Sequence, residues 1–198
     1  LHYLDFFPKK IILSNGTTKI LNECSSRSPK SCFWMKDPYT VSFFGFINDE
    51  IERYLFGKID GKGSVAVRGI LSNEFVKIYD SFQDFFEYLD AQKLRTPKGL
   101  SWIKSKYPKA SHHAQLLYEM QNLRQMNCTM WVEAVREIVS AEDSKVKFIV
   151  SDHPITVYNP ACPPNSEHCK YPSDPAIEWV GSQTIFPLAL NHCLILTN

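Results

Sequence analysis

The sequence lacks several features that would assign it to a broad class of proteins. It has no run of 18 apolar residues, so no membrane-spanning helix is expected. It has no internal repeat and no low-complexity tract, so neither a repeat protein nor a disordered chain is indicated. Lys and Arg number 22 against 21 Asp and Glu, and this formal net charge of +1 favours no partner through the overall field. The 44% of hydrophobic residues is sufficient for an ordinary core.

Cysteines are few for the length of the chain, and no secretion signal stands at its start. Six cysteines in 198 residues do not make a disulfide scaffold. Cys128 and Cys193 fall within apolar patterns, where a thiol behaves as a small buried hydrophobic group. We therefore expect a reducing compartment, the cytoplasm. The chain begins at Leu1 rather than Met and ends directly after a strand-like run, so we expect a piece trimmed at both termini.

The order of the expected elements is typical of an α+β protein. Asn15-Gly16 lies between two β-rich runs, which predicts a hairpin over residues 10–22 with a type I′ turn. Helical patterns fill the middle of the chain, and strand patterns return at residues 184–188 and 193–197. We expect one α+β domain over residues 1–198, with a mostly antiparallel sheet packed against a central set of helices.

The longest expected helix covers about residues 112–140. Its apolar stripe alternates spacings of three and four residues and comprises Leu116, Met120, Leu123, Asn127, Met130, Ala134 and Ile138. We interpret the stripe as a long helix packed in the core, with Asn127 as its polar member. Pairing with a helix of another chain is the alternative, so the oligomeric state stays open.

A polar corner between two apolar runs is the first candidate site. Residues 145–159 read as strand, turn and strand, and Ser151, Asp152 and His153 precede Pro154 at the turn. Adjacent residues on an extended segment point to alternating sides, so these three cannot form a catalytic triad among themselves. Asp152 could still act as a metal ligand or general base. The alternative is structural, with Ser151 and Asp152 bonding to the local backbone.

Several short motifs carry a family resemblance, and they are Leu1-His2-Tyr3-Leu4, Arg27-Ser28-Pro29-Lys30, Asp37-Pro38-Tyr39-Thr40, Asp49-Glu50-Ile51-Glu52, Ser151-Asp152-His153-Pro154-Ile155 and Ile185-Phe186-Pro187-Leu188. In these motifs the chain resembles the uncharacterised, mainly microbial family numbered four-two-three-eight among the domains of unknown function. The opening is similar to the family's His-His-Tyr-[Ile/Val]-Pro-like motif, with Leu1 in place of the first His. The corner is similar to its Ser-Asp-x-Pro-[Val/Ile]. The resemblance implies a fold and a set of residues, but no mechanism.

A second candidate site joins histidines and carboxylates that are distant in sequence: His2, Glu52, Asp60, Asp152 and His153. Mixed imidazole and carboxylate ligands suit a divalent metal ion that activates water for hydrolysis. In this hypothesis Asp152, His153 and Glu52 are catalytic, and Asp152, His153 and His2 hold the metal. No ligand spacing within the sequence supports it. The alternative is an exposed helix face, a helix end and a turn.

A proline-rich stretch holds a third candidate site. Cys162, His168 and Cys169 could bind structural zinc. Their spacing departs from the usual zinc knuckle, in which two to four residues separate the first pair of ligands. A disulfide between Cys162 and Cys169, or free thiols, are the alternatives. Long loops of this kind in compact domains are often functional.

A basic segment without acidic residues gives the fourth candidate site. Between Ala91 and Tyr118 there are six Lys or Arg residues and no Asp or Glu. Basic residues interleaved with aromatic ones can neutralise phosphates and stack bases. Residues 93–113 could therefore bind nucleic acid or another polyanion, and the substrate-binding candidates are Lys98, Trp102, Lys104, Lys106, Tyr107 and, from the corner, Ser151. The alternative is a solvated basic face whose aromatic residues point into the core.

Two functions follow from these sites. The first is a metal-dependent, nuclease-like hydrolase that acts on nucleic acid, as a defence or toxin effector would. The second is a non-catalytic binding or interaction module in which the Ser151–Pro154 corner is structural. The first hypothesis requires the carboxylates and histidines to converge on one point, because metal ligands lie about 2.1 Å from the ion.

Overall fold

The computed structural model describes residues 3–27, 41–43, 46–48, 51–72, 81–109, 113–163 and 165–198. The chain divides into two compact units, residues 1–38 and 39–198. Helices and antiparallel strands occur together, which confirms the expected α+β class. The expectation of one domain over the whole chain stays a prediction. His2 and the side chain of Glu52 lie outside the described part of the molecule.

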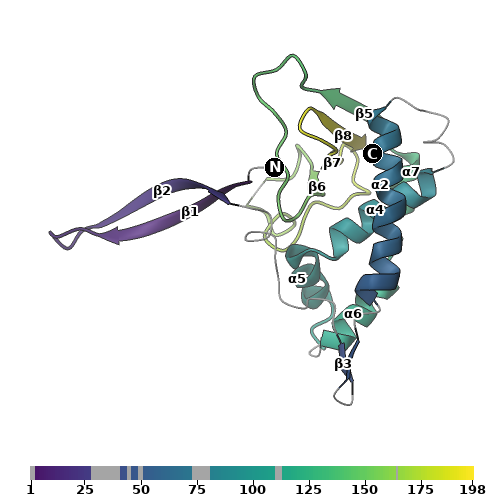
Figure 1. Cartoon of the computed structure of the whole chain (residues 1–198), viewed down its shortest axis with the longest axis horizontal. Helices are drawn as coiled ribbons and strands as arrows, with labels where there is room; N and C mark the ends of the chain where they lie inside the picture. The colour runs from purple at the N-terminus through teal and green to yellow at the C-terminus, as the bar shows by residue number, and fades with distance from the viewer. Residues whose placement is uncertain are drawn as a thin grey trace. The chain divides into compact units, whose positions relative to one another are not determined.

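The first unit contains a long antiparallel hairpin (Figure 1). Strand β1 (Tyr3–Ile12) pairs with β2 (Thr18–Arg27), so the expected hairpin is confirmed and its strands extend beyond residues 10–22. The type I′ turn is wrong, because only Gly16 of the Asn15-Gly16 pair has a positive φ, +77°. The Gly16 N–H instead donates to the Leu13 carbonyl at 2.9 Å, which gives a longer loop that ends at the glycine.

The second unit contains a four-stranded antiparallel sheet and a small hairpin. The sheet has the order β5 (Val135–Ser140), β8 (His192–Thr197), β7 (Gln183–Pro187) and β6 (Thr156–Tyr158). Strands β7 and β8 confirm the two closing strands expected from the sequence. The small hairpin consists of β3 (Val41–Phe43) and β4 (Phe46–Asn48).

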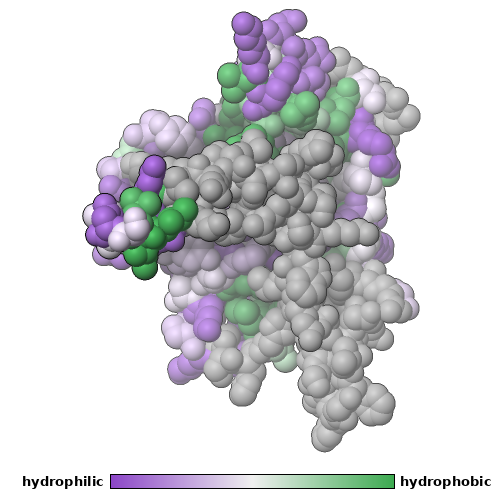
Figure 2. Space-filling view, turned by 60° about the vertical axis from the view of Figure 1, so that its left-hand side comes forward, coloured by the Kyte–Doolittle hydropathy of each residue, from purple (hydrophilic) through white to green (hydrophobic). Residues whose placement is uncertain are grey.

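The apolar run before the Ser151–Pro154 corner is not a strand, contrary to expectation. Residues 146–150 have no regular structure, and Val146 and Ile149 are 77% and 83% exposed. The inner positions of the sheet are already filled, because β8 pairs with β5 and β7, and β7 with β6. Figure 2 shows apolar side chains at the surface among polar ones on one face of the molecule.

The helices gather on one side of the four-stranded sheet (Figure 1). A π-helical segment, η1 (Ile51–Phe56), continues into α2 (Gly57–Leu71), and α4 (Phe82–Leu94) is followed by α5 (Pro97–Lys106). The chain then forms α6 (His113–Asn122) and α7 (Cys128–Glu133). In the part of the chain that the structure describes, no helix is long and apolar enough to cross a lipid bilayer.

The single long helix over residues 112–140 is wrong. Its span contains α6, a turn, α7 and the edge strand β5. Buried Asp90 on α4 causes the interruption, because its carboxylate accepts hydrogen bonds from the Gln125 N–H at 2.6 Å and the Asn127 amide at 2.8 Å. Gln125 adopts a positive φ of 68°, which ends the helix there. Asn127 is therefore buried as a partner of Asp90 and not as part of a helical stripe.

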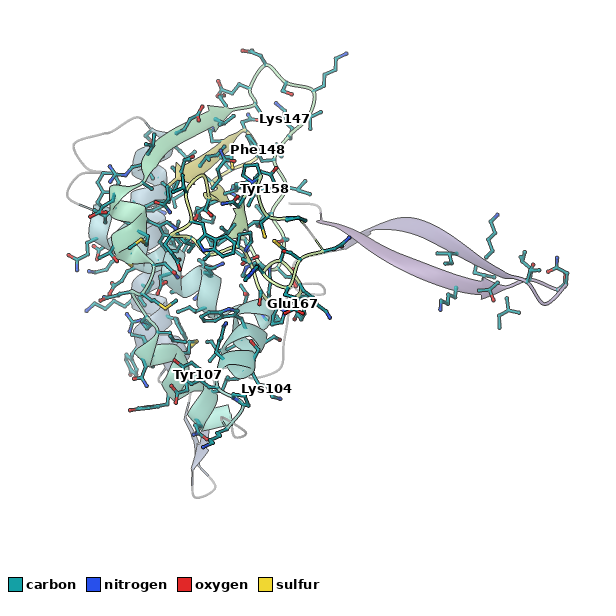
Figure 3. The ribbon with its side chains drawn as sticks, turned by 180° about the vertical axis from the view of Figure 1, so that it is seen from behind. Lys104, Tyr107, Lys147, Phe148, Tyr158 and Glu167 are labelled. Carbon is teal, nitrogen blue, oxygen red and sulfur yellow. The ribbon has the colours of Figure 1, made fainter. Side chains whose placement is uncertain are left out.

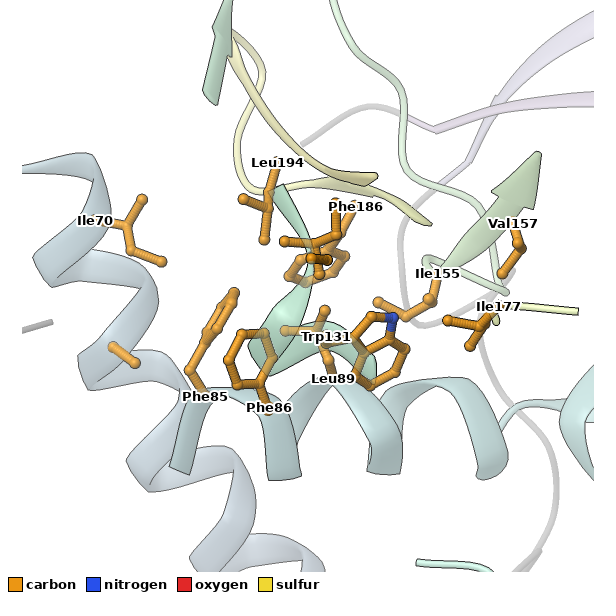
Figure 4. Close-up of a cluster of buried hydrophobic side chains, with 13 residues drawn as sticks. Ile70, Phe85, Phe86, Leu89, Trp131, Ile155, Val157, Ile177, Phe186 and Leu194 are labelled. Atoms are coloured by element: carbon orange, nitrogen blue, oxygen red, sulfur yellow. The ribbon is translucent and has the colours of Figure 1, made fainter. Parts of the chain in front are cut away.

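Helix α4 lies at the centre of the second unit, because it contributes to both of its buried apolar clusters. Phe85, Phe86 and Leu89 pack with Trp131 of α7 and with apolar residues of the sheet (Figure 4). One turn further on, Leu94 packs into a second cluster with residues of α2, α5 and α6. Packing against the sheet and the other helices therefore fixes the C-terminal end of α4. A pocket begins at this end.

Candidate functional site

A pocket of about 700 Å³ lies between the α4–α5 junction and the loop formed by residues 160–181. Five of the candidate residues from the sequence line it together, and they are Lys98, Trp102, Lys106, His153 and His168. These residues come from three separate sequence hypotheses, so the fold joins parts of them into one site.

Asp174, which the sequence did not single out, is the polar centre of the pocket. Its carboxylate accepts a hydrogen bond from Lys93 Nζ at 2.7 Å and one from Lys98 Nζ at 2.5 Å, each on a different oxygen. Burial by itself would raise the pKa of Asp174. The neighbouring His153 imidazole and the two lysine ammonium groups outweigh burial and hold that pKa well below its usual range. Asp174 is therefore a buried anion shared by two cations.

The loop that carries Asp174 is closed at its base. The Asn159 side chain donates to the Val180 carbonyl at 3.2 Å and to Ser182 Oγ at 3.0 Å, and it accepts from the Ala161 N–H at 2.9 Å. These bonds join the first and last residues of the loop, which compensates the entropy of closing it. Asp174 then fastens the middle of the loop to the helices. The expectation that this proline-rich stretch carries a site agrees with its position over the pocket.

Both lysines face the loop because α5 starts immediately after α4 ends. Thr96 caps α5 by accepting a hydrogen bond from the Gly99 N–H at 3.1 Å, and Pro97 occupies the first helical position. Gly99 permits the close approach of the two helices. A Cβ at this position would lie 2.3 Å from the Lys93 carbonyl oxygen. Lys93 on the last turn of α4 and Lys98 on the first turn of α5 therefore reach the same carboxylate.

His153 is buried at the wall of the pocket and has one free ring nitrogen. Its Nδ1 lies 2.6 Å from Thr96 Oγ1, so the helix cap also orients the imidazole. Its Nε2 finds no hydrogen-bond partner among the described residues. This nitrogen lies 3.7 Å from Oδ2 of Asp174, beyond hydrogen-bonding distance but close enough for charge attraction when the ring is protonated. A buried polar atom without a partner marks a place where a ligand atom could bind.

Burial perturbs the pKa of Lys93. Removal from water lowers the pKa of this lysine, and the positive charge of Lys98 lowers it further. The Asp174 carboxylate and, more weakly, Asp90 act in the opposite direction, but the net direction is downward. The amine is therefore easier to deprotonate than an ordinary lysine side chain.

Within the Ser151–Pro154 corner, Ser151 closes the turn and His153 lines the pocket. Ser151 Oγ donates to the His153 carbonyl at 2.8 Å and accepts from the His153 N–H at 3.1 Å. Asp152 is exposed and does not line the pocket. The expected role of Asp152 and His153 as ligands or catalytic groups finds no support in their positions and stays a prediction, because the extended chain directs neighbouring side chains to opposite sides.

The predicted metal groups do not form among the described side chains. In that part of the molecule, no three His, Cys, Asp or Glu residues are placed to hold a metal ion. The Asp60 carboxylate instead accepts hydrogen bonds from both terminal guanidinium nitrogens of Arg95, each at 2.8 Å. The contribution of Glu52 and His2 stays a prediction, because the structure does not describe their side chains.

The predicted zinc loop has no support among the described residues and stays a prediction. The sulfur atoms of Cys162 and Cys169 are 2.6 Å apart, whereas two thiolates on one tetrahedral zinc ion lie about 3.8 Å apart. His168 packs edge-on against Trp179, with ring centroids 5.0 Å apart, and so belongs to the pocket wall. The pairing of Cys162 with Cys169, as thiols or as a disulfide, is the alternative that their proximity favours.

The basic segment divides into two parts. Lys98, Trp102 and Lys106 line the pocket, whereas Lys104 and Tyr107 are exposed and do not. Figure 3 shows Lys104 on α5 and Tyr107 directly after its end, away from Glu167 on the loop over the pocket. A helix presents residues three and four positions apart on one face, which separates Lys98, Trp102 and Lys106 from Lys104.

No protein-family model, curated protein or solved structure matches the chain. The resemblance to the uncharacterised microbial family therefore stays a prediction, and the candidate site stands on its geometry.

Proposed function

We propose that the pocket binds a small organic anion with a planar or apolar part, and that the chain is a ligand-binding module. The observation that carries the proposal is the sharing of one buried carboxylate by two lysines. Lys93 and Lys98 bring two positive charges, and Asp174 neutralises one of them. A ligand carboxylate or phosphate would balance the remaining charge, since each ammonium group has further N–H donors.

The walls of the pocket suit the rest of such a ligand. Trp102 and Trp179 line it, and indole rings stack on planar groups. A volume of about 700 Å³ lies within the range of small-molecule sites. A nucleotide has the required negative charge and a planar base. In place of the nucleic-acid partner expected from the sequence, we therefore propose a ligand of the size of a nucleotide. Exposed Glu167 and Glu178 at the same pocket would oppose a long polyanion.

A metal-dependent hydrolase centred on Asp152 has less support, because Asp152 is exposed outside the pocket. The cytoplasm remains the compartment that we propose. Cys128 and Cys193 are free thiols, as a reducing compartment would leave them.

Tryptophan fluorescence and calorimetric titration test the proposal with adenosine monophosphate, indole-3-acetate and uncharged adenosine. We expect the anions to bind and adenosine to bind at least about tenfold more weakly, because the charge-assisted hydrogen bonds are lost. Lys98→Met should weaken anion binding by a similar factor. Lys104→Met removes the same charge from the exposed part of α5 and should change little. Equal losses in both variants, or no binding by either anion, would overturn the proposal.

A further inference from the structure

We infer that Lys93 is a nucleophilic amine and that the anion bound in the pocket carries an aldehyde or ketone, with which Lys93 forms an imine. The inference rests on the proposed function, because it assigns a chemical class to the ligand of the same pocket. Lys93 thereby becomes the residue that bonds the ligand, Lys98 the residue that holds its anionic group, and His153 the residue that moves protons.

The arrangement of charges makes the ammonium group of Lys93 easier to deprotonate to the neutral amine that reacts. Lys93 and Lys98 share the single carboxylate of Asp174, so their two ammonium groups have one immediate counter-charge between them. Lys93 is the more buried of the two, with 16% of its side chain exposed against 23% for Lys98. Desolvation and a neighbouring cation are the two influences that activate lysine nucleophiles in enzymes. Both act on Lys93, and its pKa is shifted in the direction that they require.

A purely structural ion pair would not need this arrangement. One lysine is enough to neutralise Asp174, and a second one adds repulsion between two ammonium groups. Lys93 and His153 both line the pocket, and the buried Nε2 of His153 has no hydrogen-bond partner among the described residues. A buried cation in excess, a free imidazole nitrogen and an open volume beside them together indicate a site that reacts with a ligand.

The reaction balances without an oxidant or reductant. The lone pair of Lys93 Nζ attacks the carbonyl carbon, a C–N bond forms, and the C=O π electrons move to oxygen. The nitrogen then loses its two protons and the oxygen accepts two. The oxygen leaves as water while the nitrogen lone pair forms the second bond of the C=N group of the imine. An acid–base group must move these protons. His153 Nε2 lies 3.7 Å from the same Asp174 oxygen, Oδ2, that Lys93 Nζ contacts at 2.7 Å, so the two groups share one neighbour.

Pyridoxal 5′-phosphate is a suitable probe, because it is planar, anionic and an aldehyde. The full chain is incubated with it and treated with borohydride, which reduces the C=N bond, and the modified lysines are identified by peptide mass spectrometry. We expect labelling of Lys93 at least about tenfold faster than of Lys104, which is an exposed lysine of ordinary reactivity. The labelling rate of Lys93 should rise with pH through a midpoint below the ordinary lysine value of 10.5.

Pyridoxine 5′-phosphate is the matched control ligand, since it has an alcohol in place of the aldehyde. We expect it to bind and to protect Lys93 from labelling in the unaltered chain. Lys93→Arg keeps a charge beside Asp174 but removes the nucleophile, so it should lose the imine. If pyridoxine 5′-phosphate binds but labelling spreads evenly over exposed lysines, the nucleophile is wrong and the anion pocket stands. If pyridoxine 5′-phosphate neither binds nor protects and Lys93 is not preferred, both proposals fail.

Discussion

At the scale of single residues, the pocket depends on a carboxylate that holds two lysines and a loop in place. The pKa of Asp174 lies below its ordinary value of 3.8, so ionised Asp174 stabilises the folded chain at pH values above 3.8. That contribution is lost as the pH falls through the folded-state pKa. The same residue therefore links acid sensitivity to the shape of the pocket.

Asp174→Asn should lower the free energy of unfolding by about 3 kcal/mol at pH 7, because two buried ammonium groups lose their counter-charge. The difference from the unaltered chain should narrow as the pH falls below 3.8, because the unfolded unaltered chain then binds a proton at Asp174 that the folded chain does not. Urea denaturation at pH 7 and at pH 3 measures both values. Glu167→Gln removes an exposed carboxylate from the same pocket and serves as the control. A constant difference at the two pH values would contradict the role given to Asp174.

Asp152→Ala should change the free energy of unfolding by less than about 0.5 kcal/mol, because the side chain is exposed. It should also leave anion binding unchanged. His153→Ala removes the partner of Thr96 and leaves a cavity in the pocket wall, so it should weaken binding. Denaturation and titration of the two variants side by side distinguish these neighbours. Loss of ligand binding in Asp152→Ala would show that Asp152 contributes to the binding site.

At the scale of elements, the α4–α5 junction sets the distance between the two lysines. Gly99→Ala should destabilise the chain by about 1 to 3 kcal/mol, as is usual when a methyl group is forced into a packed site. Its Cβ would meet the backbone of Lys93 and Leu94, which cannot yield as a side chain can. Anion binding should fall as well, because Lys93 must move.

Gly61→Ala is the matched control for this change. Gly61 lies within α2, and no atom lies within 4 Å of the position of a new Cβ. Alanine should therefore stabilise the helix by about 0.5 to 1 kcal/mol. Thermal or urea denaturation gives both values. Destabilisation by Gly61→Ala equal to that of Gly99→Ala would show that the loss is not caused by contact at the junction.

The elements differ in how far their own sequences determine them. The hairpin at Asn15-Gly16, the start of α5 at Pro97 and the closing strands follow local turn, capping and alternation rules, and these were predicted. The α6–α7 break was not, because its cause is a carboxylate 35 residues earlier in the chain. The strand Val135–Ser140 was not predicted either, because its sequence has no apolar alternation and its apolar residues continue a helical stripe.

The candidate site was predicted in part for the same reason. Lys98, Trp102 and His153 were identified by residue type and local pattern, but their convergence depends on how the loop folds back over the helices. Asp174 lies 76 residues from Lys98 in the sequence. The available signal for it was an acidic residue in a long proline-rich loop that complements an acid-free basic segment. The periodicity of apolar residues gives no information about charge complementarity between distant segments.

At the scale of the whole molecule, the described buried apolar clusters lie within residues 39–198. A chain that begins at residue 39 should therefore unfold in one cooperative transition. Its Tm should lie within about 4 °C of that of the full chain, which corresponds to roughly 1 kcal/mol for a domain of this size. Calorimetry of the two chains tests this expectation. A broad or absent transition in the shorter chain would mean that the first unit contributes to the core.

The closed base of the loop has an evolutionary consequence. Asn159 and Ser182 join the two ends of residues 160–181, so the sheet holds its register whatever lies between them. The segment that supplies Asp174, His168 and Trp179 to the pocket can therefore lengthen, shorten or be replaced while the fold is retained. Proteins that descend from one ancestral chain could therefore acquire different ligands by replacing this segment. The helical half of the pocket would stay unchanged.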